Sequence, residues 1–268
     1  MANLITNGDF ATNVTGWTGG TWSSGSIRKT RAAAGYEYAS QTVSGFTIGA
    51  LYFVRTSRKA SSGNFNCYIS IAGVATAGCN YNSDYGMVFK PTATSHTLEL
   101  GLYPGAGANG DWVEWDDVYC DLASLSANQF VVSGAFTTND GFSPTAHANI
   151  VSGRLRATRE SATNVYENST QFIYGLTVGT VYTVTYDVPN ISSASGQNFY
   201  VGINSITSDI HSTTGSYSFS FTATATTHQM EVGIFPSGGA QFDYVDFDNI
   251  SMTGPAVTRR APRSCSYS

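Results

Sequence analysis

The sequence is poor in charged residues, and basic residues are the scarcest of them. Charged side chains make up 12% of the 268 residues, with 13 Lys and Arg against 18 Asp and Glu, so the net charge is −5 at pH 7. A nucleic-acid-binding surface normally needs a basic stripe, and the body of the sequence has none. We therefore expect no nucleic-acid partner.

Long apolar runs are also missing. No stretch approaches the roughly 18 apolar residues of a membrane-spanning helix, so no membrane partner is expected. The opening residues, MANLITNGDF, lack the basic and apolar regions of a secretory signal. Either a signal has been removed or the protein is made and used without Sec export, and Met1 favours the second interpretation.

Catalytic motifs are absent as well. The four histidines are scattered, and there is no nucleophile elbow, metal-binding histidine cluster or phosphate-binding glycine loop. The carboxylates Glu114, Asp116 and Asp117 are crowded on one expected strand. The two carboxylates of a catalytic acid/base pair lie instead on opposite sides of a cleft. We expect no catalytic residues, and we do not expect an enzyme.

The four cysteines are Cys67, Cys79, Cys120 and Cys265. Cys67 and Cys79 bracket a segment that can fold as a hairpin about Gly73, so the two thiols are expected to face each other across strands. A disulfide and a pair of buried free thiols both remain open. Cys120 aligns with Met252 in an internal repeat and is expected to be a core residue.

In place of charged residues the sequence is rich in Gly, Ser, Thr and Asn, and aromatic residues make up 13% of it. Gly and Asn supply the positive φ angles of tight turns, and aromatic residues suit half-buried pleated surfaces. Amphipathic runs of helix length do not occur. The composition predicts an all-β protein.

An internal repeat organises the chain. Residues 84–122 align without a gap with residues 216–254 at an offset of 132, and residues 44–54 align with 174–184 at an offset of 130. Two modules follow, at residues 2–122 and 128–254, with a basic tail at 255–268. Short alternating segments separated by turns predict two tandem antiparallel β-sandwich (jelly-roll) domains, which leave no room for a catalytic domain.

Three landmarks of the first copy carry a family resemblance: NLITNGDFATNVTGWT, ASQTVSGFTIGALYFV and VEWDDVYCDL. Together they resemble carbohydrate-binding modules of families 4 and 9, which belong to the galactose-binding-like jelly-roll group. The second copy keeps the landmarks in weaker form, and similar landmarks recur in bacteriophage virion proteins. The resemblance implies the fold strongly and the ligand weakly.

The resemblance also implies a structural calcium ion where the first and last strands meet, near Asp116 and Asp248. The family places an acidic ligand directly after the N-terminal Phe, but Ala11 and Thr137 stand there in this sequence. Because losing an oxygen ligand weakens a calcium site, we expect no metal and no cofactor. Calcium remains the alternative to Asp116 and Asp248 accepting backbone hydrogen bonds.

Sugar-binding modules stack exposed aromatic rings on pyranose faces. The aromatic candidates are Trp17, Trp22, Tyr36, Tyr38, Tyr81, Tyr85 and Trp112. Trp17 and Tyr85 have aromatic counterparts in the second copy, which is typical of core positions. The predicted ligand-binding residues are Trp22, Tyr36, Tyr81 and Trp112.

Two functional hypotheses follow, and neither is enzymatic. The favoured one is a bacteriophage virion surface protein that docks on other virion proteins and also takes host glycans, within a homo-oligomer or larger assembly. Arg259, Arg260 and Arg263 of the tail are its predicted partner-binding residues. The alternative is a carbohydrate-binding tandem module of a secreted polysaccharide-degrading enzyme. The first predicts a location on the virion surface and the second an extracellular one.

Overall fold

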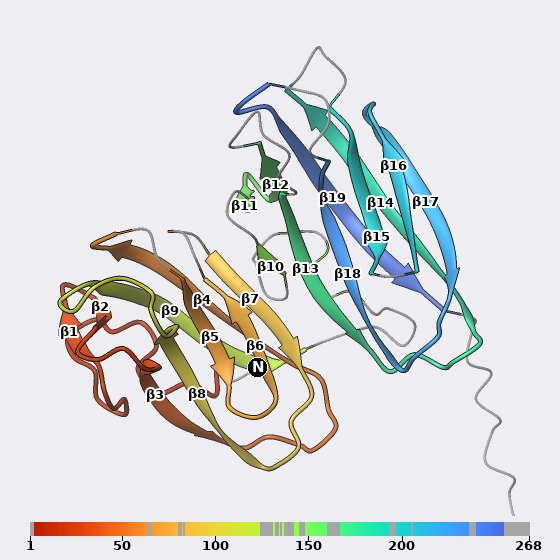
Figure 1. Ribbon diagram of the computed structural model, residues 1–268. Helices are drawn as coiled ribbons and strands as arrows, with labels where there is room; N and C mark the ends of the chain where they lie inside the picture. The colour runs from red at the N-terminus through yellow and green to blue at the C-terminus, as the bar shows by residue number, and fades with distance from the viewer. Residues whose placement is uncertain are drawn as a thin grey trace, which may run out of the picture.

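The structure is a computed structural model, and Figure 1 shows its two lobes. It describes residues 3–63, 66–79, 82, 84–123, 131, 134, 136, 142–144, 148–159, 167–192, 197–204, 206–235 and 240–254. Every regular element in these ranges is a β-strand, so the all-β prediction is confirmed. Consistent with this, no helix in the described ranges is long and apolar enough to cross a membrane.

Module 1 is a sandwich of two antiparallel sheets. Its strands are β1 (Thr21–Ser23), β2 (Ser26–Thr30), β3 (Glu37–Ser44), β4 (Tyr52–Ser61), β5 (Cys67–Ile71), β6 (Ala75–Gly78), β7 (Asp84–Phe89), β8 (Ser95–Leu102) and β9 (Trp112–Leu122). The order β1-β2-β9-β4-β7 forms one sheet, called the β9 sheet below. The order β3-β8-β5-β6 forms the other, called the β8 sheet.

Module 2 repeats this plan. Its strands are β10 (Ser143–Pro144), β11 (Ala148–Val151), β12 (Arg154–Thr158), β13 (Glu167–Tyr174), β14 (Val181–Ile191), β15 (Phe199–Ile203), β16 (Thr207–His211), β17 (Gly215–Thr222), β18 (Thr227–Ile234) and β19 (Tyr244–Thr253). The β19 sheet has the order β11-β12-β19-β14-β17, and the β18 sheet has the order β10-β13-β18-β15-β16. The short strand β10 takes the place of the single bridge between Thr18 and Ser40 in module 1.

Strict alternation builds each core. Leu98, Leu100 and Leu102 of β8 are fully buried, as the alternating pattern predicts, and the matching residues of β18 are buried too. Each module has its own cluster of buried residues. Trp17 and Tyr85 belong to the first cluster, so the prediction that they are core residues is confirmed.

The N-terminal segment of each module crosses its last strand closely. Val118 of β9 donates a backbone hydrogen bond to the carbonyl of Gly8 (2.9 Å), and Ile250 of β19 does the same to Gly134 (2.9 Å). A Cβ atom on Gly8 would lie 2.0 Å from the Val118 carbonyl oxygen. A glycine is therefore required where each opening landmark meets the closing one, and the expected pairing of the two ends is confirmed.

The β5–β6 hairpin turns at Gly73, as predicted, and brings two thiols across from each other. The backbone N–H of Cys79 donates to the carbonyl of Cys67 (2.8 Å), and both thiols are buried and free. Burial raises the pKa of Cys67 to about 11, so the thiol form dominates at neutral pH. Of the two open alternatives, the structure has the pair of free thiols; Cys120 is likewise a buried core thiol.

The two modules touch through β6 and β7 of module 1 and β10 and β13 of module 2. Gly86 donates a backbone hydrogen bond to the carbonyl of Phe142 (3.1 Å), and Lys90 lies over the ring of Tyr174 (5.8 Å). Val88 is 2% exposed although it belongs to neither core cluster. The predicted boundary between the modules covers residues 123–127, of which the structure describes only Ala123.

Candidate functional site

The outer faces of the β8 and β18 sheets carry matched residues. Because the leucines of β8 point into the core, Glu99 and Gly101 point outward, and Glu231 and Gly233 do so on β18. Tyr68 of β5 pairs in register with Gly101, and Tyr200 of β15 pairs with Gly233. A Cβ atom on Gly101 would lie 2.3 Å from the Tyr68 ring, so the glycine is what lets the ring lie flat on the sheet.

Four tyrosines surround Gly101 in module 1, and we call Tyr36, Tyr38, Tyr68 and Tyr103 the tyrosine cluster. The ring centroid of Tyr68 lies 5.0 Å from that of Tyr103 and 6.0 Å from that of Tyr36. Tyr38 pairs in register with Gly101. Tyr68 is 3% exposed and forms the floor, whereas Tyr36 and Tyr38 are 61% and 41% exposed. The cluster thus presents open ring faces on a rigid base.

A buried arginine holds the segment that carries Tyr36. The Arg31 guanidinium donates to the carbonyls of Ala33 (2.7 Å) and Tyr103, and the Glu37 carboxylate accepts from the N–H groups of Ala32 and Ala33. Burial works against ionisation of Glu37, but these N–H groups and Lys29 outweigh it and lower its pKa. The exposed ring therefore projects from a loop that is anchored on both sides.

The same place in module 2 is a hollow of about 610 Å³, within the usual size range of ligand pockets. Tyr200 forms its aromatic wall: Asn168 Nδ2 donates to the Tyr200 hydroxyl (3.2 Å), and the Phe235 ring meets it edge-on at 4.9 Å. Gly202 stands where module 1 has Ser70, which deepens the hollow. Arg159 repeats the role of Arg31, since its guanidinium donates to the carbonyl of Phe235 (2.7 Å).

Glu99 and Glu231 lie in the middle of these two faces. We call them the partnerless carboxylates, because neither has a hydrogen-bond or ion-pair partner among the residues that the structure describes. Within the described ranges, no hydrogen bond or ion pair reaches either carboxylate, and burial raises the pKa of both. Burial, with Glu99 close by, also raises the pKa of Tyr68. A half-buried carboxylate that accepts no hydrogen bond from the described residues can accept hydrogen bonds from the donors of a ligand.

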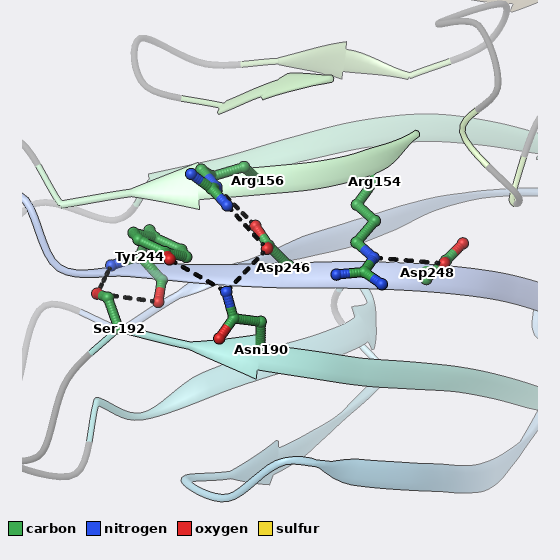
Figure 2. A network of polar contacts seen from close by, with 7 residues as sticks. All are labelled: Arg154, Arg156, Asn190, Ser192, Tyr244, Asp246 and Asp248. Carbon is green, nitrogen blue, oxygen red and sulfur yellow. Dashed lines mark hydrogen bonds and ion pairs between the residues drawn. The ribbon is translucent and has the colours of Figure 1, made fainter. Parts of the chain in front are cut away.

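On the opposite face of module 2, the outer face of the β19 sheet, charged side chains form ion pairs and hydrogen bonds with one another. In Figure 2, Arg156 of β12 forms a bidentate ion pair with Asp246 of β19 (2.7 and 2.9 Å), and Asn190 of β14 donates to Asp246 (3.3 Å) and to Tyr244 (3.0 Å). The Arg156 guanidinium also lies 3.7 Å from the centroid of the Tyr244 ring. Arg154 reaches Asp248 at 3.8 Å. Each of these charged groups already has a partner.

Module 1 builds the same arrangement around a predicted ligand residue. Arg28 donates two hydrogen bonds to Glu114 (2.9 and 2.6 Å), and its guanidinium lies 4.0 Å from the centroid of the Trp112 ring. One face of Trp112 is therefore covered by a cation. Trp22 lies at the edge of the same β9 sheet, where its indole N–H donates to the Phe10 carbonyl (2.8 Å), and it is 47% exposed.

Of the predicted ligand-binding residues, the structure describes three, and it does not bring these three together. Tyr36 belongs to the tyrosine cluster on the β8 sheet, whereas Trp22 and Trp112 belong to the other sheet of the module. Tyr81 and the tail residues Arg259, Arg260 and Arg263 lie outside the described residues. Ligand contact by Trp22, Trp112 and Tyr81, and partner binding by the tail, stay predictions.

Sequence reasoning missed Glu99 and Glu231, Tyr68 and Tyr200, and the two buried arginines. The first four match at the repeat offset of 132. Positions that both copies share are typical of core residues, which is why these four do not stand out as ligand-binding candidates. A signal was present: a carboxylate at the outward position between two core residues, at the same place in both copies. Alternation alone would have placed it on the surface of the sheet.

The position where the family resemblance implies calcium holds partners of another kind. Asp116 and Asp248 each accept a hydrogen bond from the backbone N–H of the following residue (2.8 Å in both). Lys59 lies 3.8 Å from Asp116 and 2.8 Å from Asp117. In the part of the chain that the structure describes, no group of three or more His, Cys, Asp and Glu side chains is arranged to hold a metal ion.

No family model matches the sequence, and no curated protein matches it. The resemblance to families 4 and 9 therefore stays a prediction. Among solved structures, the chain aligns with tandem family 51 carbohydrate-binding modules of a family 98 glycoside hydrolase from Streptococcus pneumoniae. The identity is 13%, the TM-score is 0.26, and the alignment covers 87% of this chain and 85% of that one.

The chain also aligns with the secreted serine protease VesC from Vibrio cholerae, at 11% identity and a TM-score of 0.30. This alignment covers 82% of the present chain and 51% of the protease, so the chain spans about half the length of the protease. Similarity at this level does not transfer a function.

Proposed function

We propose that the protein is a non-catalytic glycan-binding tandem module, and that its ligands lie on the outer faces of the β8 and β18 sheets. The observation that carries the proposal is the pairing of partnerless carboxylates with aromatic rings on those faces. Glu99 lies within the reach of the tyrosine cluster, and Glu231 lines the hollow with Tyr200 and Phe235.

Pyranose rings suit this chemistry because they have one apolar face and a rim of hydroxyl groups. The exposed rings of Tyr36 and Tyr38, and Phe235 in module 2, offer flat apolar surface at little cost in side-chain entropy. Ionised carboxylates accept hydroxyl protons in hydrogen bonds that are about twice as strong as neutral ones. Asn168, Asn204 and Ser208 add amide and hydroxyl groups around the hollow.

The charge of the site selects the class of glycan. A carboxylate in the middle of each face and a net charge of −5 repel uronic acids and sulfated sugars. The proposed ligand is therefore a neutral glycan. A glycan-binding role of this kind implies an extracellular location for the protein. The interpretation as a virion surface protein has no support in the comparisons or in the part of the chain that the structure describes.

Affinity electrophoresis of the full chain tests the proposal. Native gels containing hydroxyethyl cellulose, xylan, mixed-linkage glucan or galactomannan are compared with gels that contain an acidic polysaccharide such as pectate. At least one neutral polymer is expected to retard the wild type, and pectate is not.

The matched variants are Tyr36→Ala with Phe235→Ala on the proposed faces, and Phe53→Ala on the opposite sheet. Phe53 stacks on Tyr119 and lies on the outer face of the β9 sheet. Loss of retardation in the double variant, with retention in Phe53→Ala, is the expected result. Equal retardation of all three proteins, or no retardation of the wild type by any polymer, would overturn the proposal.

A further inference from the structure

Each partnerless carboxylate lies in a row of side chains that crosses its sheet. In module 1, strand register aligns Ser40 of β3, Glu99 of β8, Ser70 of β5 and Thr76 of β6. The hydroxyls of Ser70 and Thr76 lie 2.9 Å apart on this face. The row runs perpendicular to the strands and ends at β6, the edge that faces module 2.

Module 2 has the equivalent row on the four strands that follow its edge strand β10, whose Ser143 pairs with Thr170. Register aligns Thr170 of β13, Glu231 of β18, Gly202 of β15 and Ser208 of β16. The last three of these residues line the hollow. Both rows reach the junction between the modules, where β6 contacts β10 and β7 contacts β13.

A crevice of about 220 Å³ lies between the two rows and contains one residue of each, Thr76 and Thr170. Thr76 and Gly78 of β6 line it from module 1, and Thr170, Phe172 and Gln229 line it from module 2. Thr76 is the last residue of the first row, and Thr170 is the residue of the second row that lies next to the edge strand β10. Phe172 is 41% exposed there, so the crevice has one open aromatic ring and a set of hydroxyl and amide groups.

From this alignment we infer that the crevice is a third subsite, and that one extended neutral glycan strand runs across both modules through it. The inference rests on the proposed function and deepens it, because it selects a polymer over a terminal sugar. Phe172 stacks on the middle of the strand, and Gln229 and the two threonines bond its hydroxyls.

The strand spacing sets the length of the ligand. Eight strands at about 4.8 Å each, together with the crevice, give a path of roughly 40 Å, which a chain of roughly eight sugar residues spans. A three-residue fragment covers only one row. A strand that engages both rows binds more tightly than a fragment because its second contact is intramolecular, which commonly adds a factor of about 100 or more.

Titration calorimetry on the full chain tests the inference. The probes are three-residue and ten-residue oligosaccharides cut from the neutral polymer that retards the wild type most strongly. The expected result is about two short fragments per protein, but one long oligosaccharide per protein with an affinity about 100-fold higher.

Variants of the crevice make the test specific. Phe172→Ala and Gln229→Ala are each expected to weaken the long oligosaccharide about 10-fold and to leave the short one unchanged. Val181→Ala is the control, since this exposed residue belongs to the β19 sheet on the other side of module 2. Melting curves check that all three variants fold.

The outcomes separate the inference from the proposal on which it rests. If short and long oligosaccharides bind with the same affinity and a stoichiometry of two, the modules act independently; the inference fails and the glycan-binding proposal stands. Unchanged long-chain affinity in both crevice variants also overturns the inference. If neither oligosaccharide binds, both fail.

Discussion

Replacing Tyr36 by Ala removes the most exposed ring of the tyrosine cluster and little else. The side chain is 61% exposed, and its neighbours Tyr68 and Tyr103 are held by the sheet and by the backbone contact of Arg31. The substitution should therefore leave the fold intact. It should act on ligand affinity alone.

The size of the effect follows from the area of contact. A pyranose on one face of the Tyr36 ring removes about 80 Å² of apolar surface from water, ring and sugar together, which at about 25 cal/mol per Å² gives about 2 kcal/mol. This corresponds to an increase in Kd of about 30-fold. Tyr36→Phe keeps the ring and should change Kd by less than about threefold, since only an exposed hydroxyl is lost.

Titration calorimetry with a neutral oligosaccharide measures both variants, and circular dichroism melts verify their stability. A Tyr36→Ala protein that binds as tightly as the wild type would refute the stacking argument. So would a Tyr36→Phe protein that loses as much affinity as Tyr36→Ala, because the hydroxyl and not the ring would then carry the contact.

Three further predictions concern the same faces. Burial raises the pKa values of Glu99 and Glu231, so acidification should lower ligand affinity at a pH above the usual titration range of Glu. The double variant Glu99→Gln with Glu231→Gln should lose about tenfold in affinity and should also lose this pH dependence. Gly101→Ala should lower stability by about 1–3 kcal/mol in denaturant unfolding because its Cβ meets the buried tyrosine ring, whereas Gly35→Ala, with nothing within 4 Å of its Cβ, should cost less than about 0.5 kcal/mol. Arg31→Ala removes the donor to the carbonyl groups of Ala33, Gly35 and Tyr103 and should lower stability by about 3 kcal/mol or more. A change below about 1 kcal/mol would show that the guanidinium does not anchor the loop.

The fold was predictable because it rests on local patterns that occur twice. Alternation in 98–102 and 230–234 assigns core and surface, and a repeated glycine marks each close crossing of the N-terminal segment over the last strand. The β5–β6 hairpin also follows from Gly73 and its flanking cysteines. These features need only the period of a strand and the φ preferences of glycine.

The candidate site was only partly predictable, because its members come from separate strands. Tyr36 and Tyr38 were recognised as aromatic candidates, but their contact with Tyr68 and Tyr103 depends on the pairing of β5 and β3 with β8. Trp112 looked equally available in the sequence, yet a guanidinium from β2 lies over its ring. Whether an aromatic ring is open depends on what the neighbouring strand places beside it.

By itself, therefore, the sequence determined the class of fold, the duplication and the identity of the core, since these depend on residue periodicity within single strands. The tertiary structure decided which polar residues lack partners, which rings are open, and how the two modules align their rows. Strand register sets the first two, because it joins residues that lie tens of positions apart in the chain. The packing of β6 and β7 against β10 and β13 sets the third.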